Sequence, residues 1–280
     1  MEIVDTHFHV WELEKFSYPW PTPDMKNIYK NFYVTDLENA IEGTPVKHAI
    51  FVQCLNASVE EVDWIIDMAR THSIIKGIVA GLDIISPKLE EVIAKLKPSG
   101  LLKGVRHLFS WEKEEDWFTR EDVGVGLDIL GKHNIPFDLQ ASPQHLRYIL
   151  DTVPKHPKTN FIVDHIAVPP INTGDMETWR QDMADVAKLP NVYCKVSGII
   201  SGQTASTWKT IDFQPIIDHV LSIFGPERCI YGSDWPVFGM AEASYKEYLT
   251  LMQNLVSKLN EADQRKFFRE NAIKFYNLDI

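Results

Sequence analysis

Short apolar runs alternate with amphipathic segments from one end of the chain to the other. The apolar runs are rich in β-branched residues and predict eight strands, at 3–10, 48–54, 75–82, 102–107, 136–140, 160–165, 192–196 and 229–233. Hydrophobic positions recur with a helical period between most of these runs and predict helices near 122–132, 176–188, 214–224, 243–259 and 261–276. Because each connection is long enough for a crossover, we expect the strands to pair in parallel.

Capping residues mark where three further helices should begin. Ser58 followed by Glu61 is a capping box, in which the serine side chain bonds the third helical amide. Ser86-Pro87 and Ser142-Pro143 each combine an N-cap serine with a proline in the first turn. A helix is therefore predicted after each serine, whereas 11–36 is predicted to be a loop.

Strands and helices that alternate in this way have two simple arrangements. The closed one is a single (β/α)8 (TIM) barrel, which typically needs about 250 residues, and this chain has 280. The open one is a doubly wound sheet, which is disfavoured because no glycine-rich phosphate loop follows the first strand. No linker or repeat divides the chain, so residues 1–280 are predicted to form one domain.

Composition narrows the expected partners to small molecules. The net charge is −11 without a Lys/Arg-rich run, which argues against nucleic acid or an anionic membrane. No apolar stretch approaches the roughly 20 residues that span a bilayer. The chain enters its first strand without a signal-like segment, and its three cysteines fit a reducing compartment, so a cytoplasmic location is expected. The oligomeric state, including a homo-oligomer, is left open.

Polar residues gather at the carboxyl ends of the predicted strands, where barrel enzymes place their catalytic groups. In chain order these residues are His7 and His9, Gln53, Asp83, Arg106 and His107, Asp138 and Gln140, Asp164 and His165, Lys195 and Ser197, and Ser233, Asp234 and Trp235. His7 and His9 are two residues apart on one strand, so their imidazoles point to the same side, with Asp5 behind them. Such a pair can bind a metal or polarise a substrate carbonyl.

An ordered set of motifs resembles the amidohydrolase superfamily. The motifs are Asp5-Thr6-His7-Phe8-His9-Val10-Trp11, Gly104-Val105-Arg106, Val163-Asp164-His165, Cys194-Lys195-Val196-Ser197-Gly198 and Tyr231-Gly232-Ser233-Asp234-Trp235-Pro236. More narrowly, they resemble the lactonase-like branch, which includes L-fuconolactonases and L-rhamnonolactonases and has the 2-pyrone-4,6-dicarboxylate lactonases as relatives. The resemblance covers essentially the whole chain.

The resemblance implies that His7, His9, His165 and Asp234 form the catalytic cluster. Asp234 would be the general base for the attacking water, and the same four residues would bind one divalent cation, with Zn²⁺ the expected ion. Two departures argue against a two-metal centre: the bridging lysine is absent from the strand that ends in Arg106, and the strand at 136–140 has no histidine. Some members of the branch work without metal, so occupancy is left open.

Six further residues at the strand ends are expected to bind substrate, and several have a structural alternative. They are Arg106, Gln53, Asp83, Gln140, Lys195 and Trp235. Arg106 could instead form a salt bridge at the rim, and Lys195 could pair with Asp164 or Asp138. Gln53 and Asp83 could merely satisfy backbone groups. The loop at 11–36 is rich in aromatic residues and proline, and is either a packed plug or a substrate lid.

These expectations converge on a hydrolase that opens a small sugar lactone, such as fuconolactone or rhamnonolactone, to its aldonic acid. An aromatic pocket with few basic residues suits a polyhydroxylated lactone better than a pyrone dicarboxylate. A decarboxylase of the same superfamily would share the cluster, and an amidase would use it to cleave a C–N bond. A non-catalytic sugar-acid binding protein is the alternative from another class, and it would tolerate loss of Asp234.

Overall fold

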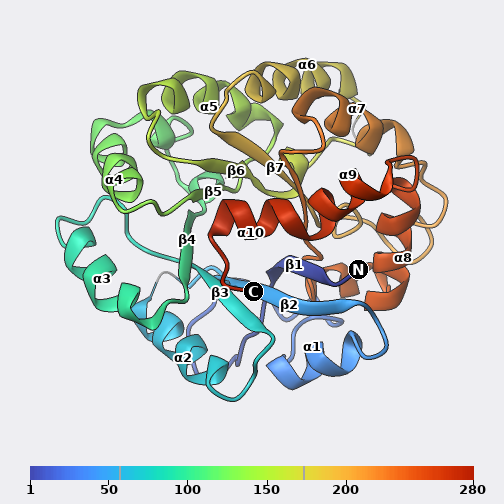
Figure 1. Cartoon of the computed structure of the whole chain (residues 1–280), viewed down its shortest axis with the longest axis horizontal. Helices are drawn as coiled ribbons and strands as arrows, with labels where there is room; N and C mark the ends of the chain where they lie inside the picture. The colour runs from blue at the N-terminus through green and yellow to red at the C-terminus, as the bar shows by residue number, and fades with distance from the viewer. Residues whose placement is uncertain (57, 173) are drawn as a thin grey trace.

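Eight parallel strands form the centre of the molecule in the order β1 to β8 (Figure 1). The structure is a computed structural model that describes residues 1–56, 58–172 and 174–280. The strands are β1 Ile3–Phe8, β2 Val46–Val52, β3 Ile75–Ala80, β4 Leu102–His107, β5 Phe137–Leu139, β6 Phe161–Val163, β7 Val192–Val196 and β8 Cys229–Tyr231. Each strand pairs with the next in parallel, as the sequence predicts.

The last strand returns to the first and closes the barrel. The Asp234 amide donates to the His7 carbonyl at 2.7 Å, and the His9 amide donates to the Trp235 carbonyl at 2.7 Å. Phe8 and Trp235 form a parallel bridge between these two hydrogen bonds. The (β/α)8 barrel predicted from the sequence is therefore confirmed, and the open doubly wound sheet is wrong.

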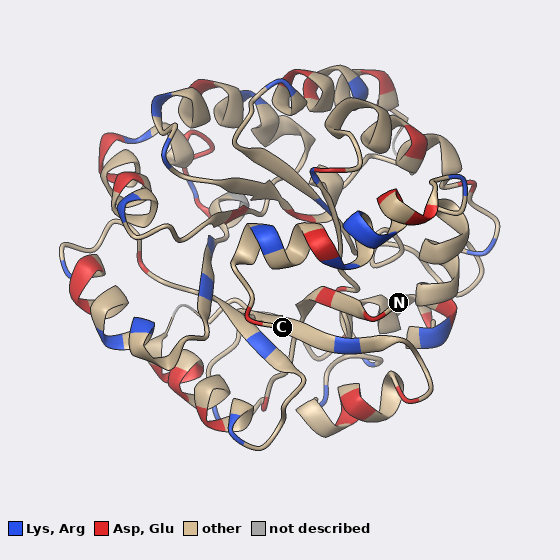
Figure 2. Ribbon diagram, viewed as in Figure 1, with Lys and Arg blue, Asp and Glu red and all other residues tan. Residues whose placement is uncertain are grey.

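Helices surround the strands, with acidic and basic residues interspersed on them (Figure 2). They are α1 Val34–Ala40, α2 Val59–Ala69, α3 Leu89–Leu96, α4 Glu121–Lys132, α5 Leu146–Thr152, α6 Met176–Ala187, α7 Gln214–Phe224, α8 Tyr245–Leu255, α9 Glu261–Arg265 and α10 Asn271–Tyr276. The Ser58 side chain accepts the Glu61 amide at the start of α2, as its motif predicts. None of the helices in the described part of the chain is both long and apolar enough to span a membrane.

Local predictions were wrong at three places. Helix α1 falls partly within the stretch predicted to be a loop. Helix α3 begins at Leu89 rather than directly after Ser86, because the Ser86 side chain accepts the Lys88 amide and forms a turn first. The expected helix at 261–276 is interrupted by a π-helical turn at Lys266–Glu270, whose Phe267 and Phe268 are buried.

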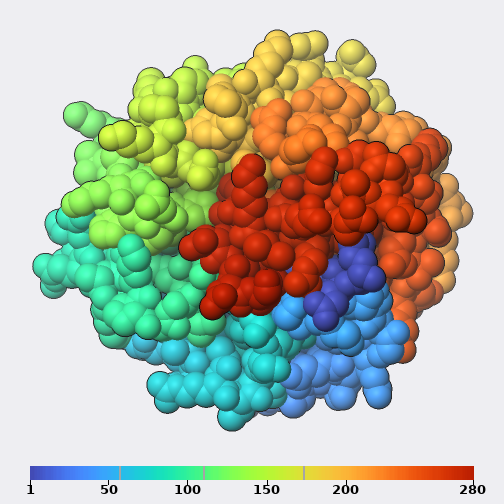
Figure 3. Space-filling view, viewed as in Figure 1, coloured from blue at the N-terminus to red at the C-terminus, as the bar shows by residue number. Residues whose placement is uncertain are grey.

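Helix α10 covers the end of the barrel at which the strands begin. The Lys103 side chain, near the start of β4, donates to the Asn277 carbonyl at 2.8 Å. Tyr193, near the start of β7, lies 4.7 Å from Phe275 between ring centroids. In the space-filling view the C-terminal residues cover the centre of this face (Figure 3). Access to the polar strand ends must therefore come from the opposite face.

The carboxylate of Asp5 holds the two closing strands in register. Its Oδ1 accepts the amides of Ser233 at 2.8 Å and His7 at 3.1 Å, and its Oδ2 accepts the hydroxyls of Ser233 at 2.6 Å and Tyr245 at 2.8 Å. Burial raises the pKa of Asp5, whereas the hydrogen bonds from Ser233 oppose that rise. The two amides and the Tyr245 hydroxyl need this acceptor, because the surrounding interior excludes water, whereas the Ser233 hydroxyl also lies 3.2 Å from the His7 carbonyl oxygen.

We expect Asp5→Ala to lower the free energy of unfolding by about 2–5 kcal/mol, since it leaves two backbone amides buried without an acceptor. Tyr245→Phe removes one of the four donors and should cost about 1 kcal/mol. Urea unfolding of the wild type and both variants measures the difference. Equal losses in the two variants would show that Asp5 is not what joins β1 to β8.

Candidate active site

Two imidazoles from the end of β1 point to the barrel axis at the open face. His9 Nδ1 lies 2.7 Å from the Val52 carbonyl oxygen and must donate to it, which leaves Nε2 as an acceptor. That Nε2 lies 3.4 Å from Asp234 Oδ1, and His7 Nε2 lies 3.8 Å from the same oxygen. Burial lowers the pKa of both histidines, well below the ordinary value in the case of His7. Neutral imidazoles are the form that binds metals.

Asp234 comes from the turn after β8 and has a left-handed backbone with φ of 66°. Its Oδ2 accepts the Ser201 hydroxyl at 2.7 Å, so the carboxylate is held from both sides. Burial by itself would raise the pKa of Asp234, but the neighbouring His165 holds it below the usual range. The group is therefore ionised at neutral pH and can accept a proton.

His165 reaches the cluster through an unusual backbone turn. His165, Ile166, Ala167 and Val168 all have positive φ, at 52°, 48°, 56° and 47°. The Trp179 indole donates to the Ile166 carbonyl at 3.0 Å and supports the turn from α6. The ring of His165 lies 4.5 Å from that of His7 between centroids, and its Nδ1 is 2.9 Å from the Ser197 hydroxyl.

The donor atoms form two overlapping groups that could each hold a divalent cation, and His7 belongs to both, whereas His165 is grouped with Asp164 rather than with His9 and Asp234. Ligand atoms of His7, His9 and Asp234 all lie within 4.8 Å of one another, and so do those of His7, Asp164 and His165. A Cβ on Gly198 would come within 2.7 Å of His165 Nδ1 and 3.0 Å of Asp234 Oδ2. The glycine therefore keeps the space between these ligands open.

A buried cluster of four charges lies beside the histidines and neutralises itself. Lys195 Nζ donates to Asp138 Oδ2 and lies 2.9 Å from Asp164 Oδ1. Arg106 donates to Asp164 Oδ2 at 3.2 Å and lies 3.3 Å from His7 Nε2. Burial raises the pKa of Asp138 to about 6, although Lys195 opposes the rise. Arg106 and Lys195 already pair with Asp164. The group formed by His7, Asp164 and His165 therefore competes poorly for a metal ion.

The six residues predicted to bind substrate differ in burial and in their hydrogen-bond partners. Their roles in substrate binding stay predictions. Arg106 is not at the rim but is 3% exposed, and it also donates to the Gln53 carbonyl at 2.6 Å. Gln53 is buried, and its side chain accepts the Leu55 amide. Asp83 is exposed and accepts the Ile85 amide at 3.2 Å.

The remaining three lie at the ends of β5, β7 and β8. Gln140 is half-buried just beyond β5, and Lys195 belongs to the charge cluster with no exposed surface. Trp235 is 6% exposed, and its ring lies 5.4 Å from that of Phe32 in the first loop.

The first loop packs against the site like a plug around Trp11. Trp11 and Phe32 pair as an antiparallel bridge, and their ring centroids are 5.3 Å apart. Trp20 packs on Trp11 at 5.6 Å, and the Trp11 indole donates to the Lys30 carbonyl at 2.7 Å. These contacts agree with the packed-plug alternative for the part of the loop that lies next to Trp235.

Two residues of the site were not predicted from the sequence. Ser201 holds Asp234, and the only signal for it was its place shortly after the Ser197-Gly198 motif. Glu61 was recognised only as a capping residue, yet it has no exposed surface. Burial raises the pKa of Glu61 to about 8, which the Cys54 amide, Arg106 and Tyr18 only partly offset.

A closed (β/α)8 barrel with histidine and aspartate ligands at its strand ends defines a barrel enzyme whose centre can hold a divalent cation. The family model described as amidohydrolase matches residues 4–278, and the chain belongs to this family. The resemblance inferred from the motifs is thereby confirmed.

Among known proteins, the chain is similar to two curated enzymes and to a solved structure from Burkholderia. An L-fucono-1,5-lactonase of Burkholderia ambifaria is 29% identical over 99% of this chain and 96% of its own length. An L-fucono-1,5-lactonase of Burkholderia multivorans is 26% identical over 98% of this chain and 96% of its own length. The crystal structure of an amidohydrolase from Burkholderia multivorans with bound zinc superposes with a TM-score of 0.92 at 24% identity, covering all of both chains.

We expect Lys195→Met to lower the free energy of unfolding by about 3–5 kcal/mol, because it leaves Asp138 and Asp164 buried beside too little positive charge. Lys209→Met removes an exposed ion pair with Glu247 and should cost less than about 1 kcal/mol. Denaturant titration of both variants tests this. A stable Lys195→Met protein with a raised KM would instead assign the lysine to substrate binding.

The raised pKa of Glu61 predicts a pH-dependent stability. Between the ordinary value of 4.5 and about 8 the folded protein keeps a proton that the unfolded chain releases, so stability falls as pH rises through this window. Glu61→Gln cannot release that proton. The stability of Glu61→Gln relative to the wild type should therefore rise by up to about 1.4 kcal/mol per pH unit in the same window.

Unfolding curves of both proteins between pH 5 and pH 8 would measure this difference. The contribution of Asp138, whose pKa is also raised, is present in both proteins and cancels. Parallel stability profiles would mean that Glu61 is ionised in the folded state throughout.

Proposed function

We propose that this chain hydrolyses a small sugar lactone to its aldonic acid, with Asp234 as the general base and residues 1–280 acting as one catalytic unit. The observation that carries the proposal is the Asp234 carboxylate, which accepts the Ser201 hydroxyl at 2.7 Å on one oxygen and lies 3.4 Å from His9 and 3.8 Å from His7 on the other. The similarity over almost the whole chain to enzymes named L-fucono-1,5-lactonase supports the choice of substrate.

Opening a lactone needs a base for the attacking water, stabilisation of the oxyanion and a proton for the leaving alkoxide. Ser201 fixes Asp234 Oδ2, so Oδ1 is the oxygen that faces the histidines and accepts the proton of the water. Once protonated, the same carboxyl group returns the proton to the ring oxygen as the ester bond breaks.

The neighbouring side chains supply the remaining requirements. Arg106 lies 3.3 Å from His7 Nε2 and would supply positive charge beside the carbonyl oxygen, on which negative charge develops, without leaving Asp164. When bound, one divalent cation on His7, His9, His165 and Asp234, which we propose to be zinc, would lower the pKa of a water towards about 7 and polarise the carbonyl. The zinc bound by the Burkholderia multivorans amidohydrolase supports this choice of ion.

The charge cluster favours a neutral substrate over a dicarboxylate. A dianionic pyrone would need cationic side chains that are free to pair with it. Arg106 and Lys195, the cations at the strand ends, are already paired with Asp164 and Asp138. Breaking these pairs to bind substrate would leave buried carboxylates uncompensated.

We expect Asp234→Asn to lower kcat on the best aldonolactone by about 10²–10⁴-fold, since an amide cannot accept the proton. Acid release from a panel of aldonolactones, followed with a pH indicator, measures the rate. Asp67→Asn removes an exposed carboxylate that pairs with Arg70 on α2 and is the matched control with unchanged activity.

Other outcomes of the same assay would overturn the proposal. Release of CO2 from a small carboxylic acid, with every lactone inert, would identify a decarboxylase. Release of ammonia or an amine would identify a C–N hydrolase. Ligand binding without turnover, unchanged in Asp234→Asn, would identify a binding protein.

A further inference from the structure

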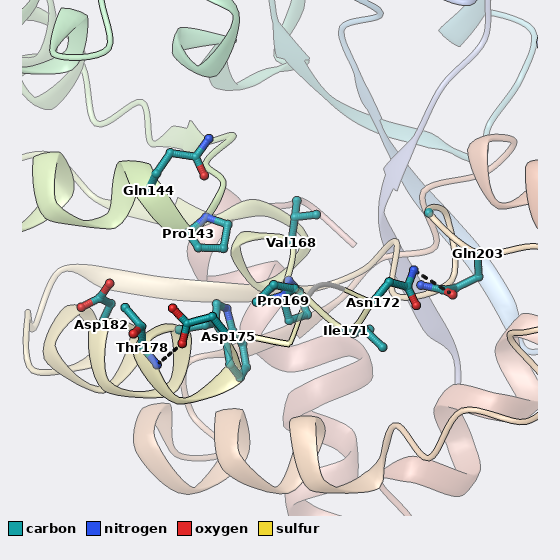
Figure 4. Close-up of a pocket in the computed structure, with 13 residues that line it drawn as sticks. Pro143, Gln144, Val168, Pro169, Ile171, Asn172, Asp175, Thr178, Asp182 and Gln203 are labelled. Atoms are coloured by element: carbon teal, nitrogen blue, oxygen red, sulfur yellow. Dashed lines mark hydrogen bonds between the residues drawn. The ribbon is translucent and has the colours of Figure 1, made fainter.

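A cavity of about 610 Å³ opens among the loops that follow β5, β6 and β7 and the start of α6 (Figure 4). A cavity of this size is in the range that binds small organic ligands. Its lining includes Gln144, Val168, Asn172, Thr178 and Gln203. His7, His9, His165 and Asp234 are not among its lining residues, so the cavity does not contain the catalytic cluster.

Two short segments join the cavity to the catalytic residues. Val168 on one wall ends the left-handed turn that begins at His165. Gln203 on another wall is two residues beyond Ser201, whose hydroxyl holds Asp234. A molecule in the cavity therefore contacts the far end of the turn that begins at His165 and a residue two positions beyond Ser201.

The chemistry of the lining suits neutral hydroxyl groups. The side-chain amides of Gln144, Asn172 and Gln203 can each donate and accept hydrogen bonds, as a hydroxyl requires. Asn172 Nδ2 lies 3.4 Å from Gln203 Oε1, which is longer than an ordinary hydrogen bond and easily exchanged for one to a ligand (Figure 4).

The charged groups in the lining are Asp175 and Asp182, and the lining contains neither lysine nor arginine. Asp175 accepts the Thr178 amide and caps α6. Burial, Asp185 and Asp175 raise the pKa of Asp182, so the local potential is negative. A carboxylate or phosphate ligand would be repelled here, whereas a neutral polyol would not.

We propose that this cavity binds the hydroxylated part of the substrate, with Asn172 and Gln203 as its specificity-determining residues. This inference rests on the proposed lactonase function. It assigns recognition of the substrate hydroxyls to Asn172 and Gln203 rather than to the residues predicted from the sequence. Of the residues predicted for that task, Arg106 and Lys195 are held in the charge cluster and Gln53 is bound to the Leu55 amide. The side-chain amides of Asn172 and Gln203 in the cavity wall are held by a longer and weaker hydrogen bond.

Binding and turnover test the proposal separately. The dissociation constants of hexose 1,5-anhydroalditols, which carry the hydroxyls but no ester, are measured by calorimetry or ligand-observed NMR. We expect Asn172→Ala and Gln203→Ala each to weaken binding by about ten-fold, the effect of one lost hydrogen bond. Gln181→Ala, on α6 but outside the lining, should bind as the wild type does.

On the best aldonolactone, KM should rise by about the same factor with little change in kcat. On δ-valerolactone, which has no hydroxyl groups, kcat/KM should stay within about two-fold of the wild type, because Asp234 and the histidines are untouched. Asn172 is exposed, so its variant keeps the test decisive if Gln203→Ala fails to fold.

The two proposals fail in distinguishable ways. If no lactone is hydrolysed, the lactonase function is wrong, but the binding measurement still decides the role of the cavity. If both variants bind the anhydroalditols as tightly as the wild type does, or if both lactones lose activity equally, the cavity is not the hydroxyl-recognition site. Tighter binding of gluconate than of the neutral polyols would also overturn the proposal.

Discussion

The active site depends on the hydrogen bonds that the Asp5 carboxylate accepts from Ser233. A barrel exists only if its last strand returns to its first, and Asp5 joins β1 to Ser233, which is 228 residues away in the chain. The same seam carries the proposed catalytic groups: His7 and His9 stand on one side and Asp234 on the other, linked by backbone hydrogen bonds of 2.7 Å. Closure of the fold and assembly of the site are therefore one event, and the polar groups at the seam satisfy structural and chemical demands together.

Charge compensation determines what this site can bind. Four charged groups are buried beside the histidines, and each cation is paired with a carboxylate. Such a network is tolerated only when it is complete, because an unpaired charge in the interior is costly. Arg106 and Lys195 thus hold Asp164 in place and are not free to pair with an anionic ligand. A second metal ion would need Asp164 as a ligand, and Asp164 is already paired with Arg106 and Lys195. This pairing agrees with a centre that holds a single ion.

Sequence periodicity predicted the barrel because parallel strands and crossover helices are each specified by local patterns. The observed bounds of β4, β7 and α7 coincide with the expected ones. That His7, His9, His165 and Asp234 lie close together could also be predicted, since strand ends converge in a barrel. Whether Lys195 binds substrate or pairs with Asp138 and Asp164 could not be decided from the sequence, because the direction of a side chain depends on its neighbours in space. In the structure it pairs with both carboxylates. Helix α1 and the hold of Ser201 on Asp234 depend on tertiary contacts that no local pattern encodes.

The turn from His165 to Val168 is the feature that local propensity opposes most. Four residues other than glycine in the left-handed region cost of the order of 1–3 kcal/mol each, and Ile166 and Val168 are β-branched. The burial of Ile166 and its hydrogen bond from Trp179 offset part of that cost. Strain of this kind persists where function requires a geometry that a relaxed chain would not adopt. Here it brings His165 next to His7 and places Val168 at the cavity wall, so one strained segment borders both proposed sites.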